Sequence, residues 1–161
     1  MASEDTLIPL SAGQGISALT AGATPFERNN RPVFQFSASV AQTLEFPGLI
    51  MPSNYSATTG IDVKMTFTAV ATTGDVDVDV ALERNDGAFD LDGNGFATAV
   101  SVDNTNVPAT SGFPFAIIVA LLTSEMDGVI KGDMFRMSIA RPNSDTASGF
   151  LELHNVEILE T

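Results

Sequence analysis

Cysteine and tryptophan are absent from this sequence of 161 residues, and histidine and tyrosine occur once each. Without cysteine there is no disulfide framework, no thiolate metal site and no cysteine nucleophile. His154 has no cysteine, serine or aspartate partner at a spacing typical of a catalytic or metal site, so we predict a structural or surface role for it. Because no disulfide or thiolate metal site can form, packing, strand pairing and contacts with partners must stabilise the fold.

Positive charge is also scarce, because 7 Lys and Arg side chains face 20 Asp and Glu side chains and the formal net charge is −13. Such a negative field repels phosphate backbones, which argues against direct binding to nucleic acid. The same charge keeps the surface solvated through self-repulsion. We therefore expect no nucleic-acid partner.

A long hydrophobic run is missing as well. The longest apolar stretch, residues 113–122, spans ten residues and contains a proline, whereas a membrane helix needs about 20 apolar residues. The first five residues also lack the basic region of a secretory signal. We expect a protein that is made in the cytoplasm and has no membrane partner.

Motifs for catalysis are absent too. The chain has no Gly-Lys-Ser/Thr phosphate loop, no Gly-x-Ser-x-Gly elbow and no His-Glu-x-x-His pair. Pairs of carboxylates are too common in so acidic a chain to indicate glycoside hydrolysis. We predict no enzyme activity, no catalytic residue and no organic cofactor.

From residue 32 onward the sequence does have a clear pattern, an alternation of apolar and polar residues with a period of two. Val76, Val78 and Val80, for example, alternate with aspartates, as in antiparallel strands with one solvated face. Turn residues such as Pro-Gly, Asn-Asp-Gly and Gly-Asn-Gly separate these runs. The pattern predicts about eight strands, at residues 32–37, 41–46, 60–70, 75–84, 97–107, 113–122, 133–141 and 150–159.

These strands predict an all-β fold, a two-sheet antiparallel β-sandwich that is jelly-roll-like. A change of phase in the last run requires a β-bulge near His154 and Asn155. One helical turn is expected at residues 123–127. The predicted core consists of Phe34, Phe36, Phe46, Val63, Met65, Phe67, Val78, Val80, Phe135, Met137 and Ile139.

The first 30 residues differ from the rest, since they are rich in Ala, Gly, Ser and Thr and have no sustained period. Such a segment buries little apolar surface by itself. We therefore divide the chain into an extended N-terminal arm, residues 1–30, and a β-sandwich domain, residues 31–161. The arm is expected to lie on a neighbouring copy or on another protein.

The apolar run at residues 113–122 places apolar side chains on both faces of its predicted strand. An outer face of this kind must be covered, either by the arm or a loop of the same chain or by another subunit. We predict an oligomer or partner interface here, in a homo-oligomer that is most simply a trimer. The residues predicted for this interface are Phe113, Phe115, Ala116, Ile118 and Leu122.

Asp90, Asp92 and Asn94 place oxygen ligands at positions 1, 3 and 5 of a calcium loop, with Gly95 at position 6. Position 12 is Ser101, where such loops have a bidentate glutamate. The same residue types are also typical of a tight β-connection. Two interpretations of this segment therefore stay open, a weak Ca²⁺ site and a simple turn.

Seven short segments within residues 31–160 carry a resemblance to a known protein family. They are Arg31–Phe34, Phe46–Tyr55, Ala69–Gly74, Lys131–Arg136, Ile139–Arg141, Asp145–Gly149 and Val156–Ile158. In these segments the chain resembles tailed-bacteriophage virion proteins of jelly-roll fold, which are head decoration (cement) proteins or small head-fibre proteins.

This resemblance implies a structural virion protein, a homotrimer that binds the major capsid protein on the outside of a phage head and stabilises the capsid. It implies a location in the virion, on the capsid exterior, after synthesis in the host cytoplasm. The alternative is a receptor- or carbohydrate-binding domain of a phage tail or fibre. Sugar binding usually needs exposed aromatic side chains, and here the only aromatic residue other than phenylalanine is Tyr55.

Overall fold

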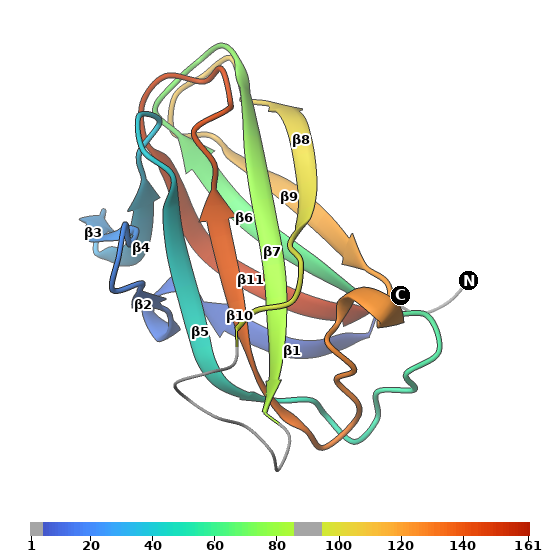
Figure 1. Cartoon of the computed structure of the whole chain (residues 1–161). Helices are drawn as coiled ribbons and strands as arrows, with labels where there is room; N and C mark the ends of the chain where they lie inside the picture. Colours follow the sequence, from blue (N-terminus) through green and yellow to red (C-terminus); the bar gives the residue numbers. More distant parts are fainter. Residues whose placement is uncertain (1–4, 86–94) are drawn as a thin grey trace.

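The computed structural model describes residues 5–85 and 95–161, which form two antiparallel β-sheets packed face to face (Figure 1). The six-stranded sheet has the strand order β3-β4-β11-β6-β9, and β1 pairs with β11 in addition. Its strands are β1 (Thr6–Ser11), β3 (Thr24–Arg28), β4 (Arg31–Phe36), β6 (Ile61–Ala69), β9 (Pro114–Leu121) and β11 (Leu151–Glu160).

The five-stranded sheet has the strand order β2-β5-β10-β7-β8. Two short 3₁₀ turns, η1 (Ala12–Gln14) and η2 (Thr123–Glu125), are the helical elements of the described chain. No helix within the described ranges has the length and apolar character needed to cross a membrane. The strands of this sheet are β2 (Ile16–Ser17), β5 (Gln42–Ile50), β7 (Asp75–Asn85), β8 (Val100–Asn106) and β10 (Met134–Arg141).

The all-β, two-sheet sandwich predicted from the alternating pattern is confirmed. The eight predicted strands correspond to β4 through β11, and every side chain predicted for the core is buried. The register of β11 against β6 shifts between Leu153 and Asn155, which confirms the predicted β-bulge. The helical turn expected at residues 123–127 corresponds to η2.

The segment at residues 6–28, which the sequence assigns to an extended arm, forms three short strands that pair within its own chain. β1 pairs with β11, β2 with β5, and β3 with β4, so this segment contributes to both sheets of its own chain. Leu10, Ala12 and Ala23 are buried in the core. The sequence pattern missed these strands because they are short and pair at the edges of sheets that the rest of the chain builds, where no period of two is required.

β9 is an edge strand with an apolar outer face, as the sequence predicts. Ile118 and Leu122 are 49% and 59% exposed. Ala116, nearer the start of the strand, is also exposed. Phe113, just before the strand, is 60% exposed. Phe115 differs from the prediction, because its ring packs against the core with its centroid 6.3 Å from that of Phe67. The subunit interface on the outward-facing residues stays a prediction.

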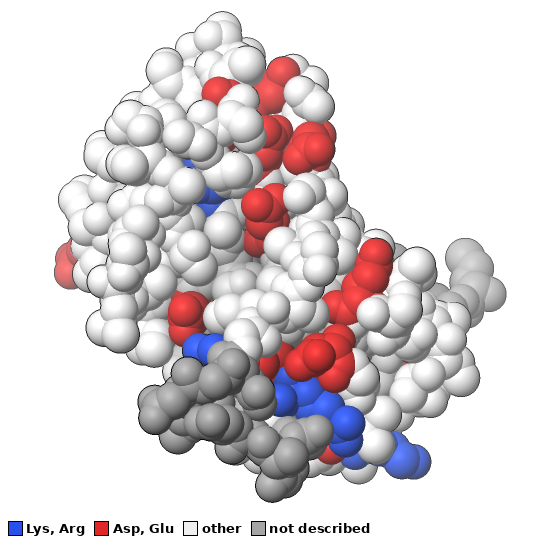
Figure 2. Space-filling view, viewed as in Figure 1, with Lys and Arg blue, Asp and Glu red and all other residues white. Residues whose placement is uncertain are grey.

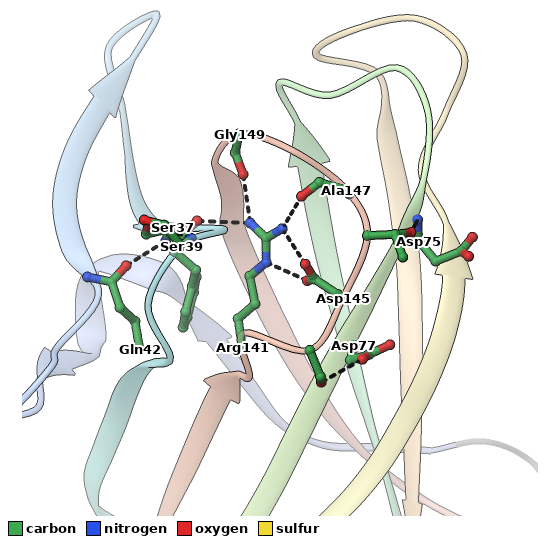
Figure 3. Close-up of polar contacts among 12 residues, drawn as sticks. Ser37, Ser39, Gln42, Asp75, Asp77, Arg141, Asp145, Ala147 and Gly149 are labelled. Carbon is green, nitrogen blue, oxygen red and sulfur yellow. Dashed lines mark hydrogen bonds and ion pairs between the residues drawn. The ribbon is translucent and has the colours of Figure 1, made fainter.

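A buried ion pair fixes the loop between β10 and β11 (Figure 3). Arg141 is 1% exposed and donates from Nε and Nη2 to the two carboxylate oxygens of Asp145, at 2.6 and 3.0 Å. Its Nη1 donates to the carbonyl oxygens of Phe36 and Gly149, and Nη2 donates to that of Ala147. Because the guanidinium is fully hydrogen-bonded, its charge is tolerated in the interior. Its hydrogen bonds connect the end of β4 to this loop.

Candidate functional site

A groove of about 630 Å³ crosses the outer face of the five-stranded sheet. One wall is the chain from Ile16 to Thr20, and Phe96 and Ala99 line the groove on the side of β8. Figure 2 shows this face of the molecule, with Asp and Glu side chains gathered over β7 and β8. The floor is formed by outward-facing side chains of β5, β7 and β10, namely Thr43, Glu45, Asp79, Arg136, Ser138 and Ala140.

The N-terminal wall of the groove is held against β5 by hydrogen bonds around Thr43. The carbonyl oxygen of Thr43 accepts from the backbone N–H groups of Ala18 and Ala23, at 3.3 and 3.0 Å. Gly22 has no room for a side chain, because a Cβ there would lie 2.0 Å from Ser17 Oγ. Residues that the sequence assigned to an arm therefore build one side of the groove.

Arg136 is the cation of the groove floor and lies between two carboxylates. Its guanidinium pairs with Glu83, which is buried, and with Glu45 at 3.5 Å. Glu83 stands directly opposite Arg136 in the β10–β7 register, so the fold itself places the pair. The guanidinium also lies over the ring of Phe96, with Cζ 4.3 Å from the ring centroid. These contacts fix the arginine side chain in one orientation.

Two aspartates of β7 extend the polar floor toward β8. Asp79 accepts a hydrogen bond from the hydroxyl of Ser101 at 2.6 Å. Asp77 is buried and accepts from the backbone N–H of Asn104 and the hydroxyl of Ser144, at 2.8 and 3.0 Å. Asp79 remains at the groove, whereas Asp77 holds β8 and the loop after β10 in place.

The groove can offer both hydrogen-bond donors and acceptors, next to apolar surface. Arg136 donates, Glu45 and Asp79 accept, and the hydroxyls of serine and threonine do both. Leu19 and Ile16 are exposed at the wall. Among the described residues, the charged side chains that line the groove are two acids and one base, so an anionic ligand would be repelled. This arrangement suits a neutral ligand with many hydroxyl groups.

Candidate ligands for metals do not converge in the described chain. Within residues 5–85 and 95–161, no group of three or more His, Asp or Glu side chains is placed to hold a metal ion. The predicted calcium ligands Asp90, Asp92 and Asn94 lie outside the described residues, so that site stays a prediction. His154 is half-buried in β11, and its Nε2 lies 2.9 Å from Thr68 Oγ1.

The groove was missed by sequence reasoning because no single segment contains it. Glu45, Glu83 and Arg136 come from three strands and meet only through the register of β5, β10 and β7. One signal was available, since Arg136 is a lone cation between two core residues of a predicted strand in a strongly acidic chain. Its partners could not be read from spacing.

Comparisons with known proteins identify the fold and no family. No protein-family model matches the chain, and no curated protein matches it. A solved xylan-binding domain, CBM22-1 from Paenibacillus barcinonensis, has a TM-score of 0.55 and 12% identity, over 99% of this chain and 97% of that one. The C-terminal CBM6 of a marine laminarinase from Zobellia galactanivorans has a TM-score of 0.52 and 10% identity, over 95% and 98% of the two chains.

A cleaved adhesin domain is similar to the same degree. The K3 domain of Lys-gingipain from Porphyromonas gingivalis has a TM-score of 0.56 and 14% identity, over 97% of this chain and 100% of that one. What these proteins share with this chain is the β-sandwich. The similarity covers nearly the whole of each chain.

Proposed function

We propose that this protein binds a neutral glycan chain in the groove on the outer face of its five-stranded sheet. The observation that carries the proposal is the fixed arrangement of Arg136 between Glu45 and Glu83, beside the ring of Phe96. Planar charged groups hold sugar hydroxyls by directed, charge-assisted hydrogen bonds. Since the ion pairs fix these side chains before a ligand arrives, little side-chain entropy is lost on binding.

The apolar part of a sugar ring also needs a partner. Tyr55 cannot supply it, because the side chain is buried and its hydroxyl donates to Met126 Sδ at 3.3 Å. Phe96 and the exposed Leu19 lie on the two sides of the groove instead. The excess of acidic over basic side chains along the groove favours neutral sugars over uronates or sulfated chains.

The similar structures support this class of ligand. Besides the xylan-binding CBM22-1, they include a CBM28 described as specific for non-crystalline cellulose, with a TM-score of 0.53. A family 11 module from Clostridium thermocellum, with a TM-score of 0.51, was solved in complex with a β-1,3-1,4-mixed-linked tetrasaccharide. Those ligands belong to those proteins. For this chain they favour neutral plant-type glucans and xylans as the first probes.

Affinity electrophoresis and calorimetry with soluble xylan, mixed-linked β-glucan and mannan test the proposal. We expect one of these polymers to bind, and Phe96→Ala and Glu45→Gln each to weaken binding about tenfold. The first removes the ring against which the sugar packs, and the second removes the negative charge that strengthens a hydrogen bond to a sugar hydroxyl. The control is Phe150→Ala, which removes an exposed ring that does not line the groove. Absence of binding to all three polymers, or equal binding by all variants, would contradict the proposal.

A second candidate function is assembly, and the exposed outer face of β9 favours it. Ile118 in β9 and Leu122 directly after it are exposed, and this edge strand carries no charged side chain. Monomeric proteins protect such edges, because they invite pairing with another chain. Together with the resemblance to phage decoration proteins, this face supports a homotrimer that attaches to the major capsid protein on the outside of a virion. The two functions use opposite sheets and are compatible.

A further inference from the structure

We propose that a second cavity, on the outer face of the six-stranded sheet, binds a sugar that carries one acidic group. The cavity has a volume of about 910 Å³, enough for a small ligand. It is bounded by the hairpin of β3 and β4, by β6 and β11, and by the residues that precede β9. The acidic group would lie between Arg28 and Arg31, and the sugar ring would pack on Phe113.

A buried carboxylate positions Arg28 at this cavity. Glu152 is fully buried and accepts hydrogen bonds from Gln35 Nε2 and Thr68 Oγ1, both at 2.9 Å. Arg28 donates to it from Nη2 at 2.9 Å, and its Nε lies 2.6 Å from the second carboxylate oxygen. Burial raises the pKa of the Glu152 carboxyl, but the hydrogen bonds from Arg28, Gln35 and Thr68 outweigh it and the pKa lies below its ordinary value. The carboxylate therefore stays ionised and anchors the arginine.

The cavity keeps an excess of positive charge after Arg28 has paired with Glu152. Arg28 Nη1 has no hydrogen-bond partner among the described residues. This nitrogen lies near Gly112 in the cavity lining, because a Cβ atom added to Gly112 would be 3.9 Å from it. Arg31 is exposed, lines the same cavity and forms no ion pair with any described residue. The cavity thus has two guanidinium groups against one carboxylate, the reverse of the balance along the groove.

The β-bulge in β11 adds two polar side chains to the cavity. Successive residues of a strand normally point to opposite faces, but the register shift between Leu153 and Asn155 lets both His154 and Asn155 line the cavity. Thr68 gives its one hydroxyl hydrogen to Glu152, so its oxygen accepts from His154 Nε2. Nδ1 is then the ring nitrogen that gains a proton in acid.

An apolar ring and amide groups complete the surface that a sugar needs. Phe113 is 60% exposed at the rim, where it can pack against the C–H face of a sugar ring. Asn29 and Asn30 form the turn between β3 and β4, with φ of 50° and 60°, and both line the cavity. Such positive φ values are those of a two-residue hairpin turn, in which asparagine is favoured. These amides can donate to and accept from sugar hydroxyls.

The net charge of the whole chain limits the size of the ligand. At −13 the protein repels a long polyanion. At physiological salt, however, charges are screened beyond about 8 Å, so a cluster of arginines can still attract one nearby anionic group. The ligand is therefore a short glycan, or the end of one, with a single carboxylate or sulfate.

Calorimetry with the full chain tests this site. The probes are methyl glucuronide for a carboxylate, galactose 6-sulfate for a sulfate, methyl glucoside for a neutral sugar, and inorganic phosphate. We expect one of the two acidic sugars to bind about tenfold more tightly than methyl glucoside, and its identity shows which anion is preferred. Arg31→Gln and Phe113→Ala should each weaken that binding about fivefold or more.

Matched variants keep the test specific. Lys131→Gln removes an exposed cation away from the cavity, and Phe150→Ala removes an exposed ring at another surface, so both should bind as the wild type does. Phe96→Ala, which alters the groove, should also leave the acidic sugar bound. The two proposals can therefore fail independently: neutral glycans can fail to bind in the groove while the acidic sugar still binds in this cavity, and the reverse.

The pH dependence gives an independent readout. Burial lowers the pKa of His154, Glu152 raises it, and Arg28 and Arg31 lower it, with a net pKa below the ordinary value. Within residues 5–85 and 95–161, no other charged group lines the cavity. A bound anion favours the protonated ring, so affinity should rise as the pH falls from about 8 toward 5.5, and His154→Gln should flatten this rise. Equal binding of neutral and acidic sugars, binding of phosphate alone, or no binding of any probe would overturn the proposal.

Discussion

At the scale of single residues, the few cations of this acidic chain are nearly all committed to ion pairs. Five of the seven Lys and Arg side chains are paired in the described chain, at Arg28, Lys64, Arg84, Arg136 and Arg141. The pairs differ in what they do. Arg141 closes a loop in the interior, whereas Arg136 and Arg28 are held at surfaces where a ligand can reach them.

Loss of the buried pair should be costly, and loss of an exposed pair should not. Asp145→Ala leaves the buried guanidinium of Arg141 without its counter-charge, so we expect the free energy of unfolding to fall by about 3–5 kcal/mol. Lys64→Ala, which removes the exposed pair with Glu157, should change it by about 1 kcal/mol or less. Urea unfolding measures both. Similar effects of the two substitutions would mean that the loop is not held by this pair.

At the scale of elements, the sequence predicted the strands that have a solvated face and a core face. Their alternation is imposed by burial on one side, so β6, β7 and β10 could be located before their neighbours were known. The three N-terminal strands could not be located in this way. Their pairing depends on edges created by β4, β5 and β11, and this information is not local. The groove was unpredictable for the same reason, since its floor depends on register.

A matched pair of leucine substitutions tests whether the N-terminal segment is part of the sandwich. Leu10→Ala should lower the free energy of unfolding by about 2–4 kcal/mol, because Leu10 is buried in the core. Leu19→Ala in the same segment should change it by about 0.5 kcal/mol or less, because Leu19 is fully exposed. If Leu10→Ala had no effect in dilute solution, the segment would not be docked on its own chain.

The outer face of β9 carries the prediction about assembly. If this face is a subunit interface, the wild-type chain should sediment as an oligomer, and Ile118→Lys should shift it to the monomer by placing a charge in an apolar contact. Ile130→Lys is the control, because Ile130 has the same exposure of 49% and lies outside β9. A wild-type monomer at high concentration would contradict an interface on this strand.

At the scale of the whole molecule, the two sheets present surfaces of different character. The outer face of the five-stranded sheet has a groove with an acidic balance, and that of the six-stranded sheet has a cavity with a basic balance and an apolar edge strand. The two packed sheets lie between these surfaces and keep them apart.

The central claim is that the groove on the five-stranded sheet binds a neutral glycan, and an NMR titration tests it most directly. Amide resonances of the ¹⁵N-labelled chain would be followed as the best-binding neutral oligosaccharide is added. We predict that the largest chemical-shift changes fall on amides of outward-facing residues of β5 and β10 and of the wall at Ile16–Thr20. The side-chain Nε–H resonance of Arg136 should shift as well. Shifts confined to β9, to the loops or to the six-stranded sheet, or no shifts with any neutral oligosaccharide, would contradict the claim.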